Sequence, residues 1–222
     1  MVASISHVLK TNVVALGIDP LATDEARAAF VEAVQSEVVP QLVAFAAPSG
    51  GPPIQGQALQ LAQDRITVES SQLRFVVERE YPEKESLDRI AELAGMAFSY
   101  PDLNGTDTAN FGFNVELVFD QDSGDTALEY LAKRIFSNNP NIPGWELAGG
   151  AGKMVFLEGG NQWNVTIEPR FNDANTSKVF CSINLHLGER PIPDREELLN
   201  CLALTWDHTM QFVEAIDANA DN

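Results

Sequence analysis

The same order of predicted elements occurs twice along these 222 residues, and this repetition constrains the fold more than any other feature. Val, Ile and Thr in residues 4–19 predict a strand. A helical pattern follows, then three strands at 57–63, 65–70 and 72–80, and a helix around 87–98. The order returns with a strand at 111–119, a helix after Gly124, strands at about 145–157, 162–171 and 178–187, and a long helix from near Asp194. Each half therefore predicts β-α-β-β-β-α.

Short matches between the halves indicate an internal duplication. The sequence VALGID at 14–19 aligns with VELVFD at 115–120, and the same offset aligns Asp24 with Asp125. The sequence RITVE at 65–69 resembles NVTIE at 164–168 at nearly the same shift. The alternative is that any two strand-turn-helix units look alike. We predict two repeats, 1–103 and 104–222, that together form one compact unit.

The first repeat carries two local expectations. An apolar stripe that begins after Thr23 or Asp24 continues at helical spacing through Val38 to Leu42, which predicts a helix of that length. Pro40 should bend or shorten this helix, because proline removes a backbone donor and crowds the preceding turn. The sequence PSGGPP at 48–53 propagates neither helix nor strand and predicts a mobile surface loop.

Short connections between alternating strands favour an antiparallel sheet, and the helices need its apolar face. The predicted class is therefore α+β, a mostly antiparallel sheet with helices packed on one face. This order resembles the duplicated TATA-binding-protein-like, or helix-grip, architecture, in which two halves share a continuous curved sheet. The resemblance implies a fold and no function, because one fold hosts many functions.

A second resemblance concerns the C-terminal half. The strand VTIEPRF at 165–171, the strand at 180–187 and the Leu-rich helix with Trp206 and His208 look like a scattered family of uncharacterised bacterial proteins. That family has no established activity, so the resemblance implies no catalytic residues.

The charge balance restricts the partners of this chain. It has 32 Asp and Glu against 14 Lys and Arg, a formal net charge of −18. Such a field repels phosphate backbones and anionic lipids, so neither nucleic acid nor a membrane is expected as a partner, whereas basic proteins, cationic ligands and divalent metals remain open. The alternative is that the charge only maintains solubility. Residues 1–10 show neither a basic leader nor a long apolar run, which predicts a cytoplasmic protein. The sequence indicates no oligomeric state.

No catalytic or cofactor signature is complete. The sequence GGAGK at 149–153 resembles a phosphate-binding loop, but Leu147 replaces the required first glycine and Met154 the required hydroxyl residue. A glycine-rich turn or bulge is the better interpretation, with Gly159 and Gly160 closing the next hairpin. The chain also has no G-x-S-x-G nucleophile elbow. The sequence therefore predicts no catalytic residue and no cofactor.

The histidines and cysteines do not have the spacing of a metal site. Cys181 and His186 are separated by an odd number of positions on one strand and point to opposite faces, whereas Cys201 and His208 can share one face of a helix. His186 and His208 converge only if that helix packs beside the strand. Structural histidines and buried free thiols are predicted, with no metal and no disulfide framework.

A polar face is predicted on the sheet of the second repeat. If Val115, Val165 and Ile183 face the helices, alternation places a set of polar side chains together on the other side. The set is Asn114, Glu116, Asn164, Thr166, Glu168, Arg170, Ser182, Asn184 and His186. Its mixed charge and its hydrogen-bonding capacity are typical of a recognition surface, and the alternative is an ordinary solvated sheet.

Two functions follow from these observations. The first is a non-enzymatic protein-binding or regulatory protein that recognises a basic partner through the polar face or the acidic surface, as acidic immunity or antitoxin proteins do. The alternative is a small-molecule-binding protein or hydrolase with a pocket between the sheet and the C-terminal helix.

Overall fold

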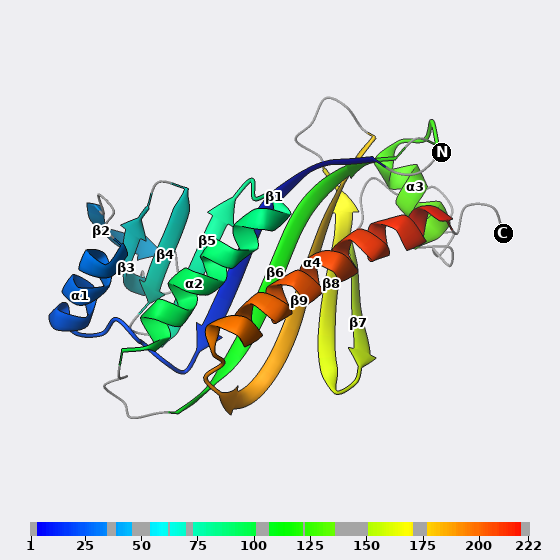
Figure 1. Ribbon diagram of the computed structural model, residues 1–222. Coiled ribbons are helices and arrows are strands. Elements are labelled where there is room, and N and C mark those ends of the chain that lie inside the picture. Colours follow the sequence, from blue (N-terminus) through cyan, green and yellow to red (C-terminus); the bar gives the residue numbers. More distant parts are fainter. Residues whose placement is uncertain are drawn as a thin grey trace. The chain divides into compact units, whose positions relative to one another are not determined.

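The computed structural model describes residues 4–34, 39–45, 54–61, 63–69, 73–100, 107–121, 123–135, 151–170 and 177–218. Within these ranges the chain forms nine strands and four α-helices (Figure 1). The elements are β1 (Ser4–Leu16), α1 (Asp24–Val34), β2 (Val39–Phe45), β3 (Ile54–Gln60), β4 (Asp64–Glu69), β5 (Arg74–Glu80), α2 (Leu87–Phe98), β6 (Thr108–Asp120), α3 (Ala127–Arg134), β7 (Gly152–Glu158), β8 (Asn161–Pro169), β9 (Lys178–Pro191) and α4 (Arg195–Ala218). None of the helices in the described part of the chain combines the length and apolar character that a membrane span requires.

The strands form one antiparallel sheet in the order β2-β3-β4-β5-β1-β6-β9-β8-β7, which confirms the α+β class. The strands β1 and β6 are neighbours in the middle of this order. From β1 toward one edge the strands are β5, β4 and β3, and from β6 toward the other edge they are β9, β8 and β7, so in each half the last strand in sequence lies next to the first. The first half has one further strand, β2, at its edge. The strand order thus agrees with two equivalent halves, while their origin by duplication stays a prediction.

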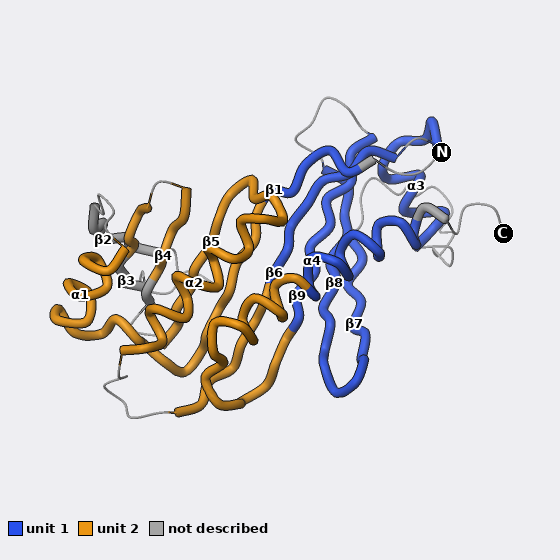
Figure 2. The backbone as a smooth tube through the Cα atoms, viewed as in Figure 1, with its two compact units in different colours: residues 1–9, 114–185, 204–222 blue, residues 10–113, 186–203 orange. Residues whose placement is uncertain are grey.

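Packing divides the chain into two compact units that do not coincide with the two repeats (Figure 2). Unit 1 comprises residues 1–9, 114–185 and 204–222, and unit 2 comprises residues 10–113 and 186–203. The reason is that β1, β6, β9 and α4 each contribute residues to both units. The repeat boundary at 103/104 is a boundary in sequence and stays a prediction.

The prediction for residues 24–42 is wrong in its second half. Helix α1 ends at Val34, and Leu42 lies in β2, which pairs with β3 in the register Leu42 to Gln57. Pro40 has no N–H to continue a helix, and β2 is an edge strand, where a missing donor is tolerated. Val38 and the predicted loop at 48–53 lie outside the described residues.

Unit 2 places α2 on the apolar face of β5. Phe98 of α2 packs against Phe75 of β5, with ring centroids 5.3 Å apart, and edge-on against Phe111 of β6, at 5.8 Å. Leu87 and Ile90 of α2 are buried on the same side of the helix. These contacts are the helix-on-sheet packing that the alternating strands predicted.

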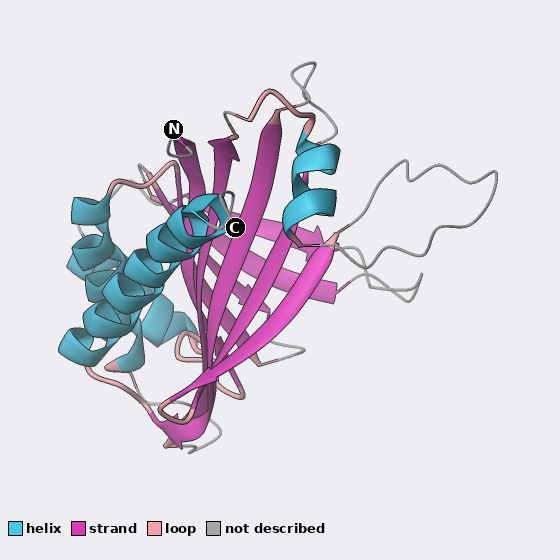
Figure 3. Cartoon of the chain, turned by 90° about the vertical axis from the view of Figure 1, so that its right-hand side faces the viewer, coloured by secondary structure: helices cyan, strands magenta, loops and turns pink. Residues whose placement is uncertain are grey.

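Unit 1 repeats this packing with α3 and the second part of α4, and Figure 3 shows the helices in cyan beside the strands in magenta. Along β6 the residues Val115, Leu117 and Phe119 are fully buried, and the Phe119 ring meets Tyr130 of α3 edge-on at 6.3 Å. Between β7 and β8, Gly159 and Gly160 have φ of 57° and 90°. Positive φ at both central residues is what a two-residue hairpin turn requires, so the interpretation of this glycine pair is confirmed.

Helix α3 begins with a capping box. The Thr126 hydroxyl accepts a hydrogen bond from the Glu129 backbone N–H at 3.2 Å, and the Glu129 carboxylate accepts one from the Thr126 N–H at 2.8 Å. This second bond, from the Thr126 backbone, holds the pKa of Glu129 below its ordinary value of 4.5.

Replacement of Thr126 by Ala should lower the free energy of unfolding by about 1 kcal/mol at neutral pH. The lowered pKa means that the Glu129 carboxylate stabilises the folded chain above pH 4.5, and that this contribution is lost as the pH falls through the lowered value. Alanine keeps the backbone N–H but removes the 2.9 Å bond that the Thr126 hydroxyl donates to the Glu129 carboxylate, which is the second cause of the lowered pKa. The cost of Thr126→Ala should therefore shrink in acid, as measured by urea unfolding at several pH values. Thr23→Ala is the matched control, because Thr23 caps α1 through the Ala26 N–H with no carboxylate in the bond. A cost of Thr126→Ala that stays constant with pH would contradict this account.

Candidate functional site

The predicted polar face lies on the side of β6, β8 and β9 opposite the helices. The predicted residues within these strands are half-exposed and alternate with buried ones, and Arg170, one position past the end of β8, is half-exposed as well. Unit 1 contains Asn114, Glu116, Asn164, Thr166, Glu168, Arg170, Ser182 and Asn184 of this set. His186 is also half-exposed, but it belongs to unit 2. We call the part in unit 1 the outer face.

Hydrogen-bonded amides cross the outer face in a row. Asn164 donates from Nδ2 to Asn184 Oδ1, and Asn184 donates from Nδ2 to Asn114 Oδ1, both at 2.9 Å. Gln162 extends the row by donating to Asn164 Oδ1, also at 2.9 Å. Each amide holds its neighbour, so the side chains are fixed before any partner arrives. We call these four residues the amide row.

Two exposed apolar side chains adjoin the amide row on β7, the last strand of the sheet. Val155 pairs with Asn164, and Leu157 pairs with Gln162, so both lie on the outer face. Val155 is 63% exposed and Leu157 is 79% exposed. A strand interior that exposes such residues at a sheet edge is a site where another chain can bind.

The opposite side of the same strands contains a cavity of about 310 Å³. It lies between β7, β8 and β9 on one side and the unit 1 part of α4 on the other. Its lining residues are Phe156, Glu158, Trp163, Val165, Ile183, His208, Gln211, Phe212 and Ala215. The lining is almost entirely apolar, with Glu158, Gln211 and His208 as its polar members.

His208 is fixed in this cavity by three contacts. Its ring stacks on Trp163, with centroids 4.4 Å apart and an interplanar angle of 6°. Its Nδ1 lies 3.0 Å from the Leu204 carbonyl oxygen, and its Nε2 lies 3.1 Å from the Glu158 carboxylate. Both ring nitrogens thus face acceptors of this chain, so the ring is held as part of the cavity wall.

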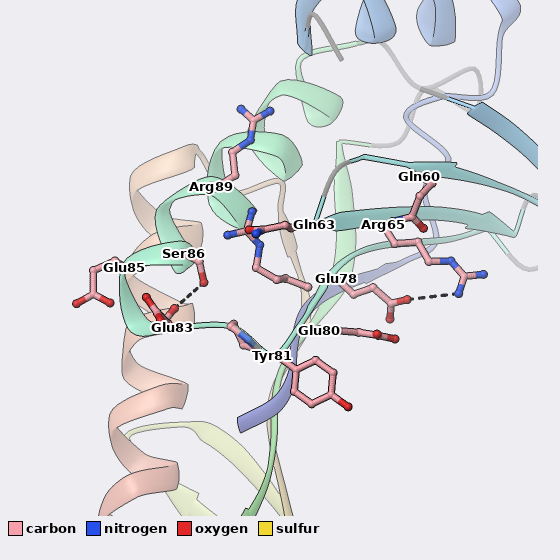
Figure 4. A pocket seen from close by; sticks show the side chains of 12 residues that line it. Gln60, Gln63, Arg65, Glu78, Glu80, Tyr81, Glu83, Glu85, Ser86 and Arg89 are labelled. Carbon is pink, nitrogen blue, oxygen red and sulfur yellow. Dashed lines mark hydrogen bonds and ion pairs between the residues drawn. The ribbon is translucent and has the colours of Figure 1, made fainter. Parts of the chain in front are cut away.

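Unit 2 contains a larger groove, of about 810 Å³, at the end of β5 (Figure 4). Its lining carries four glutamates and three arginines, together with Gln60, Gln63 and Tyr81. Each arginine has a carboxylate partner within the chain. These pairs are Arg79 with Asp64 at 2.6 Å, Arg89 with Glu92 at 2.7 Å, and Arg65 with Glu78 at 3.9 Å. Since Glu80, Glu83 and Glu85 are exposed, the groove attracts cations.

Tyr81 lines the groove (Figure 4) and has an unusual backbone conformation. Its φ is 50°, in the left-handed region, and the residue is 68% exposed. A bulky residue with positive φ is an outlier. The short 3-10 turn Lys84–Ser86 that follows, fixed by a bond from Ser86 Oγ to the Glu83 carbonyl, leads into α2.

No model of a protein family, no curated protein and no solved structure matches the chain. The resemblances drawn from the order of elements and from the C-terminal half therefore stay predictions. The outer face, the cavity and the groove are therefore the features of this chain that bear on its function.

Burial disfavours the thiolate form of both free cysteines. Burial raises the pKa of the Cys181 thiol to about 12, and burial, assisted by the charge of Glu197, raises the pKa of Cys201. A thiol that stays protonated is a weak nucleophile and a weak metal ligand. Among the described residues, no group of three or more His, Cys, Asp or Glu could hold a metal ion. In the GGAGK sequence, Gly149 lies outside the described residues, and Gly152 and Lys153 begin β7.

The structure adds residues that the sequence did not single out. Gln162 is the start of the amide row, and Val155 and Leu157 extend the outer face. The four apolar residues from Met154 to Leu157 were a possible signal for Val155 and Leu157, because they place apolar side chains on both faces of a strand. Such a run is typical of a strand buried on both sides, so exposure at a sheet edge could not be predicted from it.

Proposed function

We propose that this protein is a non-enzymatic binding protein that recognises a basic protein partner through the outer face of unit 1. The observation that carries the proposal is the amide row beside two exposed apolar residues, Val155 and Leu157. Fixed polar groups flanked by exposed apolar side chains have the composition of a protein–protein interface. An acidic immunity or antitoxin protein is one form that such a binder takes.

The amide row favours binding because its side chains are already ordered. An amide side chain has two N–H donors and two acceptor lone pairs, and the row uses one of each at Asn184 and Asn164. Capacity for hydrogen bonds to a partner therefore remains at fixed positions. Ordering a flexible side chain on association costs about 0.5–1.5 kcal/mol, and a side chain that is already held loses less.

The net charge of −18 favours a basic partner and makes the association sensitive to salt. Attraction at long range increases the rate of encounter, while Val155 and Leu157 supply apolar area at the contact itself. We expect the affinity to fall as the ionic strength rises. An affinity that does not change with ionic strength would contradict a basic partner.

Leu157→Lys tests the outer face. The change removes an apolar contact and places a positive charge where a basic partner would sit, so it should weaken binding at least tenfold, a loss of about 1.4 kcal/mol. The measurement is affinity purification from the native host with the wild-type chain, followed by titration of the captured protein against each variant. Lysine is well tolerated on an edge strand, so the fold should be retained.

Leu16→Lys is the matched control. Leu16 is also an exposed leucine on a strand, 42% exposed at the end of β1 in unit 2, and its replacement changes the net charge by the same amount. The control should bind the captured protein like the wild type. Equal loss in both variants would show that only total charge matters, and equal retention in both would place the interface elsewhere; either result would refute the proposal.

A further inference from the structure

The outer edge of β7 can pair with a further strand. In the described sheet β7 is the last strand, labelled in Figure 1, and its pairing with β8 occupies one of its two edges. An edge strand presents a row of backbone N–H and C=O groups to which another extended chain can bond. Four successive residues of β7, from Val155 to Glu158, are exposed. Another chain can therefore approach the backbone along this edge.

The hairpin turn determines which residues direct their backbone groups to the outer edge. The turn between β7 and β8 has two residues, so the residues that flank it, Glu158 and Asn161, form a hydrogen-bonded pair. Bonded and unbonded pairs alternate along an antiparallel ladder. The pairs made by Lys153, Val155 and Leu157 are therefore unbonded, and the N–H and C=O groups of these residues point away from β8. We call them the open-edge residues.

Apolar side chains are exposed on both faces of β7. Val155 and Leu157 are 63% and 79% exposed on the outer face, and Phe156 is 46% exposed on the helix side. Phe156 lines the cavity of unit 1 and meets Phe212 of α4 edge-on, with ring centroids 6.2 Å apart. The side chains of an added strand would alternate between the two faces. Such a strand would therefore find apolar neighbours on both of its sides.

We infer that the basic partner binds β7 by strand addition, through an extended segment with apolar residues opposite Val155, Phe156 and Leu157 and with lysine or arginine beside them. The inference rests on the proposed function and specifies how the partner binds. The net charge of −18 favours a basic segment, and the Glu158 side chain, 62% exposed, offers a carboxylate at the end of β7. In strand addition the main-chain bonds give affinity and the alternate side chains give specificity.

A second copy of this chain is the other candidate to pair with β7. Each copy carries a net charge of −18, and the repulsion between two copies opposes their association. The chain alone should therefore be a monomer in size-exclusion chromatography with light scattering. A dimer that Val155→Pro dissociates would place a second copy on this edge and overturn the inference.

Val155→Pro and Val155→Ala separate backbone pairing from side-chain contact. Proline removes the N–H that Val155 directs to the outer edge and keeps an apolar side chain, whereas alanine keeps the N–H and shortens the side chain. That N–H makes no bond to β8, so proline should be tolerated, as it is at such positions of other edge strands. Urea unfolding checks that both variants fold.

The probe is a synthetic peptide that alternates valine and threonine between two pairs of lysines. It should bind Val155→Pro at least about fivefold more weakly than Val155→Ala, because a backbone hydrogen bond is lost, as measured by NMR titration of the full chain. In the wild type, the peptide should slow hydrogen exchange at the amides of Lys153, Val155 and Leu157. The amides of Met154 and Phe156 bond to β8 already, so their exchange should change less.

Three results would overturn strand addition without refuting the proposed function. They are absence of saturable peptide binding, equal affinities of Val155→Pro and Val155→Ala, and unchanged exchange at the open-edge residues. The same peptide with glutamate in place of lysine tests the basic partner itself, and it should bind about tenfold more weakly. If the two peptides bound equally, a basic partner would be wrong, and the proposed function would be refuted together with the inference.

Discussion

Asp64→Ala should lower the free energy of unfolding by about 3 kcal/mol, because it leaves the Arg79 guanidinium buried without its carboxylate. In the wild type, two bonds join these side chains across β4 and β5, from Arg79 Nε to Oδ1 at 2.6 Å and from its NH2 to Oδ2 at 2.7 Å. The side chains are 14% and 6% exposed. Water reaches the guanidinium only from the groove and replaces the lost partner incompletely, so the remaining charge destabilises the fold.

The double variant Asp64→Ala, Arg79→Met separates the cost of an unpaired charge from the value of the pair. Replacing both members of a buried ion pair by apolar groups is often nearly neutral, so the double variant should unfold within about 1 kcal/mol of the wild type. Urea denaturation measures all three proteins, and an unchanged slope shows that only stability has changed. If the double variant were as unstable as Asp64→Ala, the loss of stability would come from the packing around Asp64 and not from an unpaired charge on Arg79.

Trp163→Ala should also lower the free energy of unfolding by about 3 kcal/mol, whereas Asn164→Ala, at the next position of β8, should cost about 1 kcal/mol. Trp163 is buried and stacked on His208, so its removal leaves a void on the helix side. The value is at the low end for a buried tryptophan because an unsatisfied N–H is removed with it. Asn164 loses only hydrogen bonds of the half-exposed amide row.

Thermal and urea unfolding of Trp163→Ala and Asn164→Ala measure the loss of free energy of unfolding in each variant. The contrast tests the assignment of the two faces of β8, since adjacent residues of a strand point to opposite sides. Similar costs at both positions would mean that the outer face is as tightly packed as the helix side, which would remove the basis for a binding surface there. Circular dichroism should show the same secondary structure in both variants.

The cavity and the charged groove show why the sites were harder to predict than the fold. His208 is distant in sequence from Trp163 and Glu158, which share one hairpin, and it meets them because the unit 1 part of α4 packs on β8 and β7. Trp163 lies two positions from Val165 and so shares its face of β8, but no pattern in the sequence gives the position of α4 along the strands. Arg79 and Asp64 likewise become partners only through the register of β4 and β5. A shift of that register by one residue would turn one side chain to the other face.

Local pattern alone determined most of the elements of this protein. Alternation in Phe111 to Phe119 predicts β6, and the helical spacing of Leu87, Ile90 and Phe98 predicts α2, because burial on one face has a period that the chain itself carries. Tertiary structure decided the conformation of residues 39–45, which form a strand paired with β3 although the apolar spacing that reaches Leu42 is typical of a helix. It also decided which side chains meet in the amide row and around the cavity. Those contacts depend on strand register and helix placement, which are set by packing between distant segments and not by any local period.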